Sequence, residues 1–283
     1  MISNASLPDL VLEPVVRAAL MEDLGAYGDI TSRAVVPRDL TYRAALNARE
    51  AAIVSGMQLA RLAFHLVDPT LRVEVVINDG APCEKGDVLM TITGSATAIL
   101  SAERVALNFA GHLTGIATKT AGFVARAYGT HARITCTRKT TPGLRAVEKL
   151  AVLHGGGANH RFSLSDAVMI KDNHIAAAGG VRAALSAARR NASHMSAVQI
   201  EVDTLAQLDE VLSCGGAQVV LFDNMDTATL AQAVRTTDRR LITEASGNVT
   251  QDRVAEIAAT GVDFISSGAL THSVKGVDLG LDF

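Results

Sequence analysis

The stretch Val198–Asn224, VQIEVDTLAQLDEVLSCGGAQVVLFDN, holds one complete strand–helix–strand unit. Val198–Val202 is a short β-branched run typical of a buried strand, and Leu205–Ser213 has the apolar spacing of an amphipathic helix. A second strand is predicted at Gln218–Phe222. Two strands joined by one helix predict a parallel pair with a right-handed crossover.

The same alternation continues on both sides of this unit. Further strands are predicted at Arg133–Thr137, Ala167–Ile170, Leu241–Thr243 and Val262–Ile265, and further helices at Val181–Asn191, Thr227–Arg235 and Gln251–Ala259. No G-x-G-x-x-G motif opens a helix after the first strand, so a dinucleotide-binding sheet is disfavoured. The second half of the chain therefore predicts a parallel β/α barrel.

The first half indicates a smaller unit that mixes helices and strands. Helices are predicted at Leu7–Leu24 and Gly56–Val67, strands at Tyr42–Arg49 and Leu71–Ile77, and a long Ala-rich helical stretch at Ala96–Tyr128. Within that last stretch, Gly111, Gly115 and Gly122 are expected to break or bend the helix, because glycine is a poor helix former.

Composition narrows the class of protein. The 283 residues suffice for one large domain, or for one large and one small domain. Hydrophobic residues make up 48% of the chain and aromatic residues only 4%, so the core must consist mainly of Ala, Val, Leu and Ile. The formal net charge of -3 argues against a general nucleic-acid-binding protein.

The sequence also bears on location. The first ten residues, MISNASLPDL, lack the basic and apolar regions of a signal peptide, and no apolar run approaches membrane-spanning length. The three cysteines are an odd number and lack metal-ligand spacing, so reduced thiols are expected. We therefore expect a cytoplasmic protein with no membrane partner.

Positive charge is concentrated in one segment. Between Arg133 and His174 there are seven Lys or Arg residues against three acidic residues, a local charge of +4 that leaves -7 for the rest of the chain. Such asymmetry in a mildly acidic protein points to a focused electrostatic field for a small anion.

Polar residues follow every predicted strand of the second half. They are Arg138 and Lys139, Lys171 and Asp172, Glu201 and Asp203, Asp223 and Asn224, the group Glu244, Ser246 and Gly247, and the group Ser266, Ser267 and Gly268. In a β/α barrel the C-terminal ends of the strands converge on one mouth, where catalytic groups lie. Six strands that each deliver polar groups to one rim favour a functional site over a purely structural barrel.

The residue types at this rim indicate the ligands. Cations bind carboxylates and phosphates, and the carboxylates can hold Mg²⁺ or accept ribose hydroxyls. Backbone N–H groups in the segments Ser246–Asn248 and Ser267–Gly268 can cradle a phosphate. The predicted ligands are one phosphorylated sugar and one small carboxylate.

Several segments resemble the signature segments of the quinolinate phosphoribosyltransferase family. They are TCTRKTTPGLR (135–145), GGGANHR (155–161), IKDNHI (170–175), GDITS (28–32), ERVALNF (103–109) and SSGALTHS (266–273). The resemblance implies an N-terminal open α/β sandwich at residues 1–112, an incomplete six- or seven-stranded parallel β/α barrel at 113–268, and a C-terminal tail at 269–283 that returns to the first domain. It also implies a homodimer with shared active sites, with hexamers left open.

The resemblance also implies an activity. The family joins quinolinate to phosphoribosyl pyrophosphate in the presence of Mg²⁺ and releases pyrophosphate and CO₂. The product, nicotinate mononucleotide, serves de novo NAD biosynthesis.

The resemblance further implies the site residues. Quinolinate would be bound by Arg104, Arg138, Lys139, His160, Arg161 and Lys171, and phosphoribosyl pyrophosphate by Glu201, Asp223, Ser246, Gly247, Asn248, Ser267, Gly268 and His272. Catalysis would fall to Lys139, Lys171, Glu201 and Asp223, and Mg²⁺ would be held by Glu201 and Asp223, directly or through water. Asp172, Asn173 and His174 would orient Lys171.

Other functions fit parts of this pattern. A molybdenum-transport-associated paralogue shares the fold but tends to lack the Lys-Asp-Asn-His segment, which is intact at residues 171–174. A nicotinate phosphoribosyltransferase would need fewer cations, because its substrate has one carboxylate. A lysine-dependent aldolase would use Lys139 or Lys171 as a Schiff base, and a non-catalytic phosphate-binding scaffold would not need Glu201 and Asp223.

Overall fold

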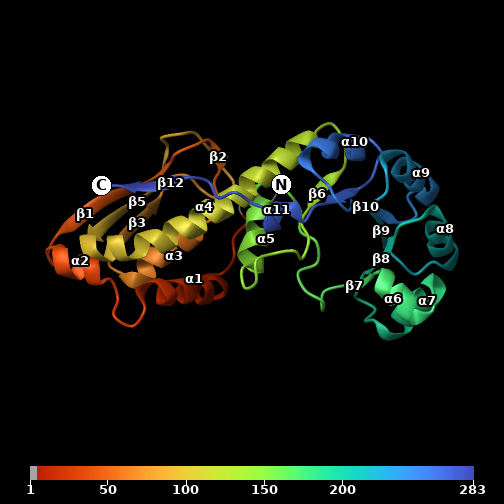
Figure 1. Cartoon of the computed structure of the whole chain (residues 1–283), viewed down its shortest axis with the longest axis horizontal. Coiled ribbons are helices and arrows are strands. Elements are labelled where there is room, and N and C mark those ends of the chain that lie inside the picture. The colour runs from red at the N-terminus through yellow and green to blue at the C-terminus, as the bar shows by residue number, and fades with distance from the viewer. Residues whose placement is uncertain (1–4) are drawn as a thin grey trace. The chain divides into compact units, whose positions relative to one another are not determined.

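The computed structural model describes residues 5–283, which form two compact units (Figure 1). The first unit takes the residues up to Ala121 together with 140–156 and 270–283, and the second takes 122–139 and 157–269. The contacts thus group segment 140–156 with the first unit. The division into consecutive segments 1–112, 113–268 and 269–283 stays a prediction.

The first unit contains an antiparallel sheet with strand order β12-β1-β5-β3. Its strands are β1 (Thr41–Ala48), β3 (Arg72–Val75), β5 (Val88–Ser95) and β12 (Leu279–Asp282), and a second pair is formed by β2 (Ala52–Ile53) and β4 (Pro82–Cys83). β1 alternates buried and more exposed residues over its second half, as expected for a strand with one face on a core. The tail strand β12 pairs with β1 through Ala45↔Asp282 and the three following pairs.

Helices complete the first unit. They are α1 (Asp9–Leu24), α2 (Ile30–Val35), α3 (Met57–Val67), α4 (Ala96–Arg126), which continues into the second unit, α5 (Arg145–His154) and α11 (Ala269–His272). α3 buries Met57, Leu59 and Phe64 among others, and α1 packs against it. Figure 1 shows α3 and α4 lying along the sheet. The predicted helices at 7–24 and 56–67 are confirmed.

The glycines do not break α4, contrary to that part of the expectation, because α4 is one helix from Ala96 to Arg126. Its glycines allow a close backbone approach instead. A Cβ on Gly115 would lie 2.4 Å from the carbonyl oxygen of Lys275, and one on Gly111 would lie 2.9 Å from that of Val277. The Val277 amide donates to the Gly111 carbonyl at 3.0 Å, so the tail lies directly on the helix.

The second unit contains a six-stranded parallel sheet with order β6-β11-β10-β9-β8-β7. The strands are β6 (Arg133–Thr135), β7 (Val168–Ile170), β8 (Val198–Val202), β9 (Val219–Asp223), β10 (Ile242–Ser246) and β11 (Phe264–Ser266). All six predicted strands are present within one or two residues at most ends. The first and second strands in sequence, β6 and β7, form the two edges of the sheet, so the predicted incomplete β/α barrel is confirmed.

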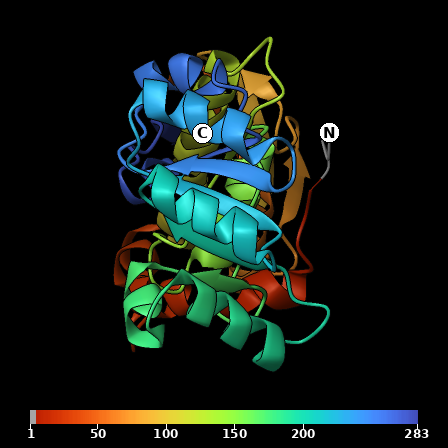
Figure 2. The same ribbon diagram turned by 90° about the vertical axis from the view of Figure 1, so that its right-hand side faces the viewer.

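Helices flank these strands on the outside. They are α6 (Asp172–Ala178), α7 (Val181–Asn191), α8 (Leu205–Cys214), α9 (Thr227–Thr237), the 3-10 turn Gln251–Arg253 and α10 (Val254–Ala258). Figure 2 shows α7, α8 and α9, coloured green to blue, in front of the strands. Beyond β6, Thr135 forms a single parallel bridge with Ala158. This bridge lies where a seventh strand would extend the sheet. Within residues 5–283, no helix combines the length and apolar character needed to cross a membrane.

The close approach of the tail to α4 generates a stability prediction. Gly115→Ala should lower the free energy of unfolding by about 2 kcal/mol, because the new methyl group meets backbone that cannot rotate away. Gly122→Ala is the matched control on the same helix, since its Cβ would meet only the flexible end of Gln251 and alanine favours the helix. Thermal unfolding of both variants is the measurement, and a Gly115→Ala protein as stable as the Gly122→Ala protein would contradict this packing.

Candidate active site

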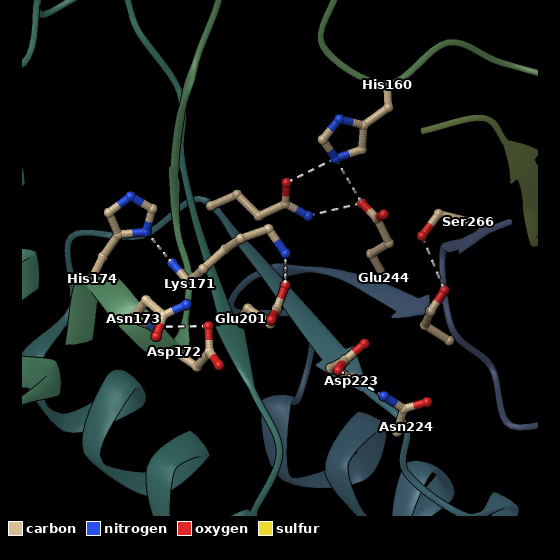
Figure 3. Close-up of polar contacts among 12 residues, drawn as sticks. His160, Lys171, Asp172, Asn173, His174, Glu201, Asp223, Asn224, Glu244 and Ser266 are labelled. Atoms are coloured by element: carbon tan, nitrogen blue, oxygen red, sulfur yellow. Dashed lines mark hydrogen bonds and ion pairs between the residues drawn. The ribbon is translucent and has the colours of Figure 1, made fainter. Parts of the chain in front are cut away.

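The strand register of the second unit gathers polar side chains on one face. Paired residues of parallel strands share a face, and side chains alternate along each strand. Glu201 pairs with Leu221, and Leu221 pairs with Glu244, so these three side chains share one level. Asp223 and Ser246 pair two residues further toward the strand ends, on the same face. Figure 3 shows Glu201, Asp223 and Glu244 around one site at the ends of the strands.

Lys171 forms an ion pair with Glu201. Its ammonium nitrogen donates to the Oε2 atom of Glu201, whose side chain is 13% exposed. The Lys171 backbone N–H donates to Nδ1 of His174 at 3.0 Å, and the His174 amide donates back to the Lys171 carbonyl at 2.9 Å. Asp172, Asn173 and His174 thus form the first turn of α6, and His174 fixes the backbone from which the Lys171 side chain projects (Figure 3).

A tight loop follows β9 and β10. Asn224 donates from Nδ2 to Asp223 Oδ2 at 2.8 Å and receives a bond of 3.0 Å from Asn248 Nδ2 on its own Oδ1. The backbone N–H of Asn224 donates to the Ser246 carbonyl at 3.0 Å. Gly247 has a φ of +91°, and a Cβ there would lie 2.2 Å from Asn224 Oδ1, so only glycine fits. The backbone of Ser246–Asn248 is therefore held against the end of β9.

The segment after β11 uses part of its hydrogen-bonding capacity internally. The Ser267 amide donates to the Thr135 carbonyl at 3.1 Å, and its hydroxyl donates to the Val249 carbonyl at 3.0 Å. Ser266 and Ser267 are both buried. In this structure both donors of Ser267 are thus engaged within the protein, while Gly268 follows directly at the strand end.

Two arginines from the basic segment lie close enough to repel each other. Burial lowers the pKa of the Arg161 guanidinium, and the charge of Arg138 lowers it further. Arg161 donates from Nη1 to the Ala167 carbonyl at 2.9 Å, while its buried Nε has no hydrogen-bond partner within residues 5–283. Two partly buried like charges are stabilised by an anion placed near both of them.

The loop after Arg161 is held by Asp166. The Asp166 carboxylate accepts from the Phe162 and Ser163 amides at 2.5 and 3.1 Å and from the Ser163 hydroxyl at 2.6 Å. These bonds, led by the one from the Ser163 side chain, lower the pKa of Asp166. The loop is thereby fixed next to Arg161.

His160 contacts two residues to which the sequence assigned no ligand role. Gln199 on β8 lies between His160 and Glu244. Its Oε1 atom is 3.0 Å from His160 Nε2, and its Nε2 atom donates to Glu244 Oε2 at 2.8 Å. His160 Nε2 is 3.7 Å from the same Glu244 oxygen (Figure 3). The sequence predicts Glu244 at a strand end, whereas Gln199 lies inside an apolar run. In sequence, Gln199 is a single polar residue within a run typical of a buried strand, so no local signal marks it.

Three further residues complete the predicted site, namely Lys139, Arg104 and His272. Lys139 follows β6 and is exposed. Arg104 is exposed on α4, and His272 in α11 contacts the Ser273 hydroxyl through Nδ1 at 2.6 Å. Arg104 and His272 belong to the first unit, so the contacts within the second unit do not include them. Their predicted roles stay predictions.

The carboxylates at the strand ends can be considered as metal ligands. Residues 5–283 contain no group of three or more His, Cys, Asp or Glu side chains suited to hold a metal ion. Glu201 and Asp223 place two carboxylates on adjacent strands. Mg²⁺ is commonly bound by one or two carboxylates together with substrate phosphates and water, so this pair fits Mg²⁺ carried by a phosphorylated substrate.

Comparison with known families matches both halves of the chain. Residues 29–114 match the family described as quinolinate phosphoribosyl transferase, N-terminal domain, and residues 116–282 match its C-terminal domain.

Individual relatives agree with this match. The chain is 44% identical to quinolinate phosphoribosyltransferase [decarboxylating] 1b of Nicotiana tabacum, over 97% of this chain and 83% of the relative. It is 40% identical to the probable nicotinate-nucleotide pyrophosphorylase [carboxylating] of Bacillus subtilis, over 96% and 93%. The crystal structure of NadC from Streptococcus pyogenes superposes with a TM-score of 0.95 at 36% identity, covering 99% of this chain and 98% of that one. With both domain types matched in order and relatives that align almost end to end, the chain belongs to the quinolinate phosphoribosyltransferase family.

Proposed function

We propose that this protein transfers the phosphoribosyl group of phosphoribosyl pyrophosphate to quinolinate with decarboxylation, giving nicotinate mononucleotide, pyrophosphate and CO₂. The observation that carries the proposal is that the second unit holds both a pair of mutually repelling arginines and a lysine–carboxylate ion pair. Arg138 and Arg161 repel each other, as expected where an anion binds, and the Lys171–Glu201 pair lies on the same unit. The role of the enzyme would be in de novo NAD biosynthesis.

The chemistry needs alignment more than a protein nucleophile. The pyridine nitrogen of quinolinate attacks the ribosyl carbon, which becomes cationic as pyrophosphate leaves. Arg138, His160 and Arg161 would hold the two carboxylates and so aim the nitrogen. After transfer, the positively charged ring can stabilise the carbanion left when CO₂ departs, and this carbanion then takes up a proton from solvent to give the C–H bond of the product. The protein therefore acts by orientation and charge stabilisation.

Lys171 and Glu201 would act at the reacting carbon. The ion pair fixes the lysine near the site, where its positive charge can serve both the quinolinate and the pyrophosphate. Glu201 and Asp223 would accept the ribose hydroxyls, and Lys139 would assist Lys171. Mg²⁺, when bound by Glu201 and Asp223, would neutralise charge on the leaving pyrophosphate.

The 5′-phosphate would lie against the loop after β10. Gly247 and Asn248 stand at the end of β10 in a backbone arrangement fixed by Asn224, and Ser246 lies beside them. Gly268 follows the adjacent strand, and Ser267 and His272 were also expected to contribute. Backbone N–H groups at such positions commonly bind phosphate in barrels.

We also propose a homodimer in which one subunit's N-terminal domain completes the partner's site. Arg104 would then reach the quinolinate of the other subunit. Assembly into hexamers is left open, and the cytoplasmic location remains a prediction. The molybdenum-transport-associated paralogue and the non-catalytic scaffold are not favoured, because the Nicotiana relative is named a quinolinate phosphoribosyltransferase and the Bacillus relative a probable nicotinate-nucleotide pyrophosphorylase.

The reaction can be tested directly. Purified protein should release pyrophosphate only when quinolinate, phosphoribosyl pyrophosphate and Mg²⁺ are all present, and chelation of Mg²⁺ should abolish release. A coupled pyrophosphate assay and mass-spectrometric detection of nicotinate mononucleotide provide the measurement. Release of pyrophosphate with nicotinate but not with quinolinate would contradict the proposal.

Quinolinate should bind at least about tenfold more tightly than nicotinate. A monocarboxylate leaves one of the partly buried cations without its anionic partner, and unmatched buried charge is costly. Isothermal titration calorimetry with each acid gives the two dissociation constants. Equal constants would show that the site is built for one carboxylate.

The shared site can be tested by mixing two inactive variants. In a dimer of Arg104→Ala and Lys171→Ala subunits, one site combines the intact barrel of the first with the intact N-terminal domain of the second. The opposite site carries both substitutions. With random exchange at equal concentrations, about a quarter of parental activity should return, because half of the dimers are mixed.

Native mass spectrometry of a tagged pair would verify that subunits have exchanged. Exchange without recovered activity would mean that Arg104 acts within its own chain. Mixing Arg104→Ala with a tagged copy of itself is the matched control and should restore nothing.

A further inference from the structure

Gln199 connects His160 to a buried carboxylate, and the connection fixes where hydrogens must be. A carboxylate oxygen of Glu244 can only accept, so the Gln199 Nε2 group donates to it at 2.8 Å. The other end of the Gln199 amide is then its oxygen, which can only accept. His160 Nε2, 3.0 Å from that oxygen, must therefore carry a hydrogen.

The Glu244 carboxylate, at the end of this series of hydrogen bonds, is deeply buried. The Glu244 side chain is 6% exposed and that of His160 is 13% exposed. The Oε1 atom of Glu244 is buried and has no hydrogen-bond partner within the described residues 5–283. A buried carboxylate that accepts a single hydrogen bond from a side-chain amide is unfavourable unless a cation lies nearby.

The neighbouring cations of the site are engaged with other groups. Lys171 pairs with Glu201, and Arg161 donates from Nη1 to the Ala167 carbonyl. The Nε2 atom of His160 lies 3.7 Å from the Glu244 carboxylate. In Figure 3 dashed lines join one ring nitrogen of His160 to the Glu244 carboxylate and to a neighbouring side chain, and the other ring nitrogen points away from both.

We propose that Gln199 and Glu244 are positioning residues that hold the His160 ring with Nε2–H directed into the barrel and Nδ1 directed to a carboxylate of the substrate. Nδ1 can donate to a carboxylate only if it also carries a hydrogen, which makes the ring an imidazolium. The second proton comes from solvent, and the buried charge of Glu244 stabilises the imidazolium that results. This inference rests on the proposed function, since it takes quinolinate as the ligand of His160.

Two substitutions separate orientation from charge. Gln199→Met keeps the length of the side chain but removes both hydrogen bonds, and Glu244→Gln keeps the shape but removes the charge. Each should weaken quinolinate binding about tenfold, the order expected when a hydrogen bond to a charged group is lost. Affinity for phosphoribosyl pyrophosphate should not change, because neither residue touches its proposed site. Calorimetry with each substrate is the measurement.

Asp263→Asn is the matched control. Asp263 immediately precedes β11 and accepts bonds of 2.8 and 2.7 Å from the amide and hydroxyl of Thr243. Asp263 is thus a carboxylate hydrogen-bonded to a neighbouring strand, but it lies at the N-terminal ends of the strands, away from Gln199 and Glu244. The substitution should lower stability without altering quinolinate affinity. An equal loss of quinolinate affinity in Asp263→Asn would mean that the effects of Gln199→Met are general and would overturn the proposal.

A double-mutant cycle with His160→Asn tests whether Gln199 acts through His160. If it does, Gln199→Met should weaken quinolinate binding in the parent but cause little further loss in the His160→Asn background. Additive losses would overturn the positioning role. Should Gln199→Met fail to fold, Glu244→Gln takes its place in the cycle, with the same two outcomes.

Nitrogen-15 NMR of His160 provides a readout that does not depend on substrate. The parent without ligand should show a protonated Nε2, and Gln199→Met should lose this preference. When quinolinate is added, Nδ1 should become protonated in the parent but not in Glu244→Gln. An unprotonated Nε2 in the parent would refute the inference. If the parent binds no quinolinate, the proposed function fails, whereas a protonated Nε2 that depends on Gln199 still supports the positioning role.

Discussion

The register of six parallel strands is the constraint on which the site depends. Side chains alternate along a strand, so a shift by one residue would turn Glu201 and Asp223 away from the face they share. The same register places Glu244 level with Glu201 across the intervening Leu221. Groups far apart in sequence therefore meet without any long loop, because backbone hydrogen bonding has already fixed their face and height.

The carboxylates of Glu148, Glu201 and Glu244 are largely or fully buried, and each contacts a specific partner. Glu201 is paired with Lys171, and Glu244 is reached through Gln199 and His160. In the first unit, Glu148 is fully buried and accepts from His112 Nε2 at 2.9 Å and from the Thr141 amide at 3.1 Å. Because burial without a partner is costly, these contacts restrict where each charge can lie. Functional groups gain fixed positions in the same way as structural ones.

Much of the barrel could be predicted because its signals are local. Strands such as Val198–Val202 are short β-branched runs, and the intervening helices have regular apolar spacing. The behaviour of α4 could not be predicted, because glycine lowers helix stability locally but the tail residues Lys275 and Val277 require small residues beneath them. Sequence spacing contains no information about that contact, which forms between residues more than 150 positions apart.

The site shows the same division between local and distant information. The cations of the basic segment could be found from composition, since anion binding requires charge irrespective of exact geometry. Gln199 could not be found, because in sequence it is one polar residue within a buried strand. Its importance arises only when Glu244 and His160 approach from two other segments and leave one geometry for its amide. A neutral residue can thus decide which nitrogen of a histidine faces a buried carboxylate, because hydrogen-bond donors and acceptors must alternate along a buried series of hydrogen bonds.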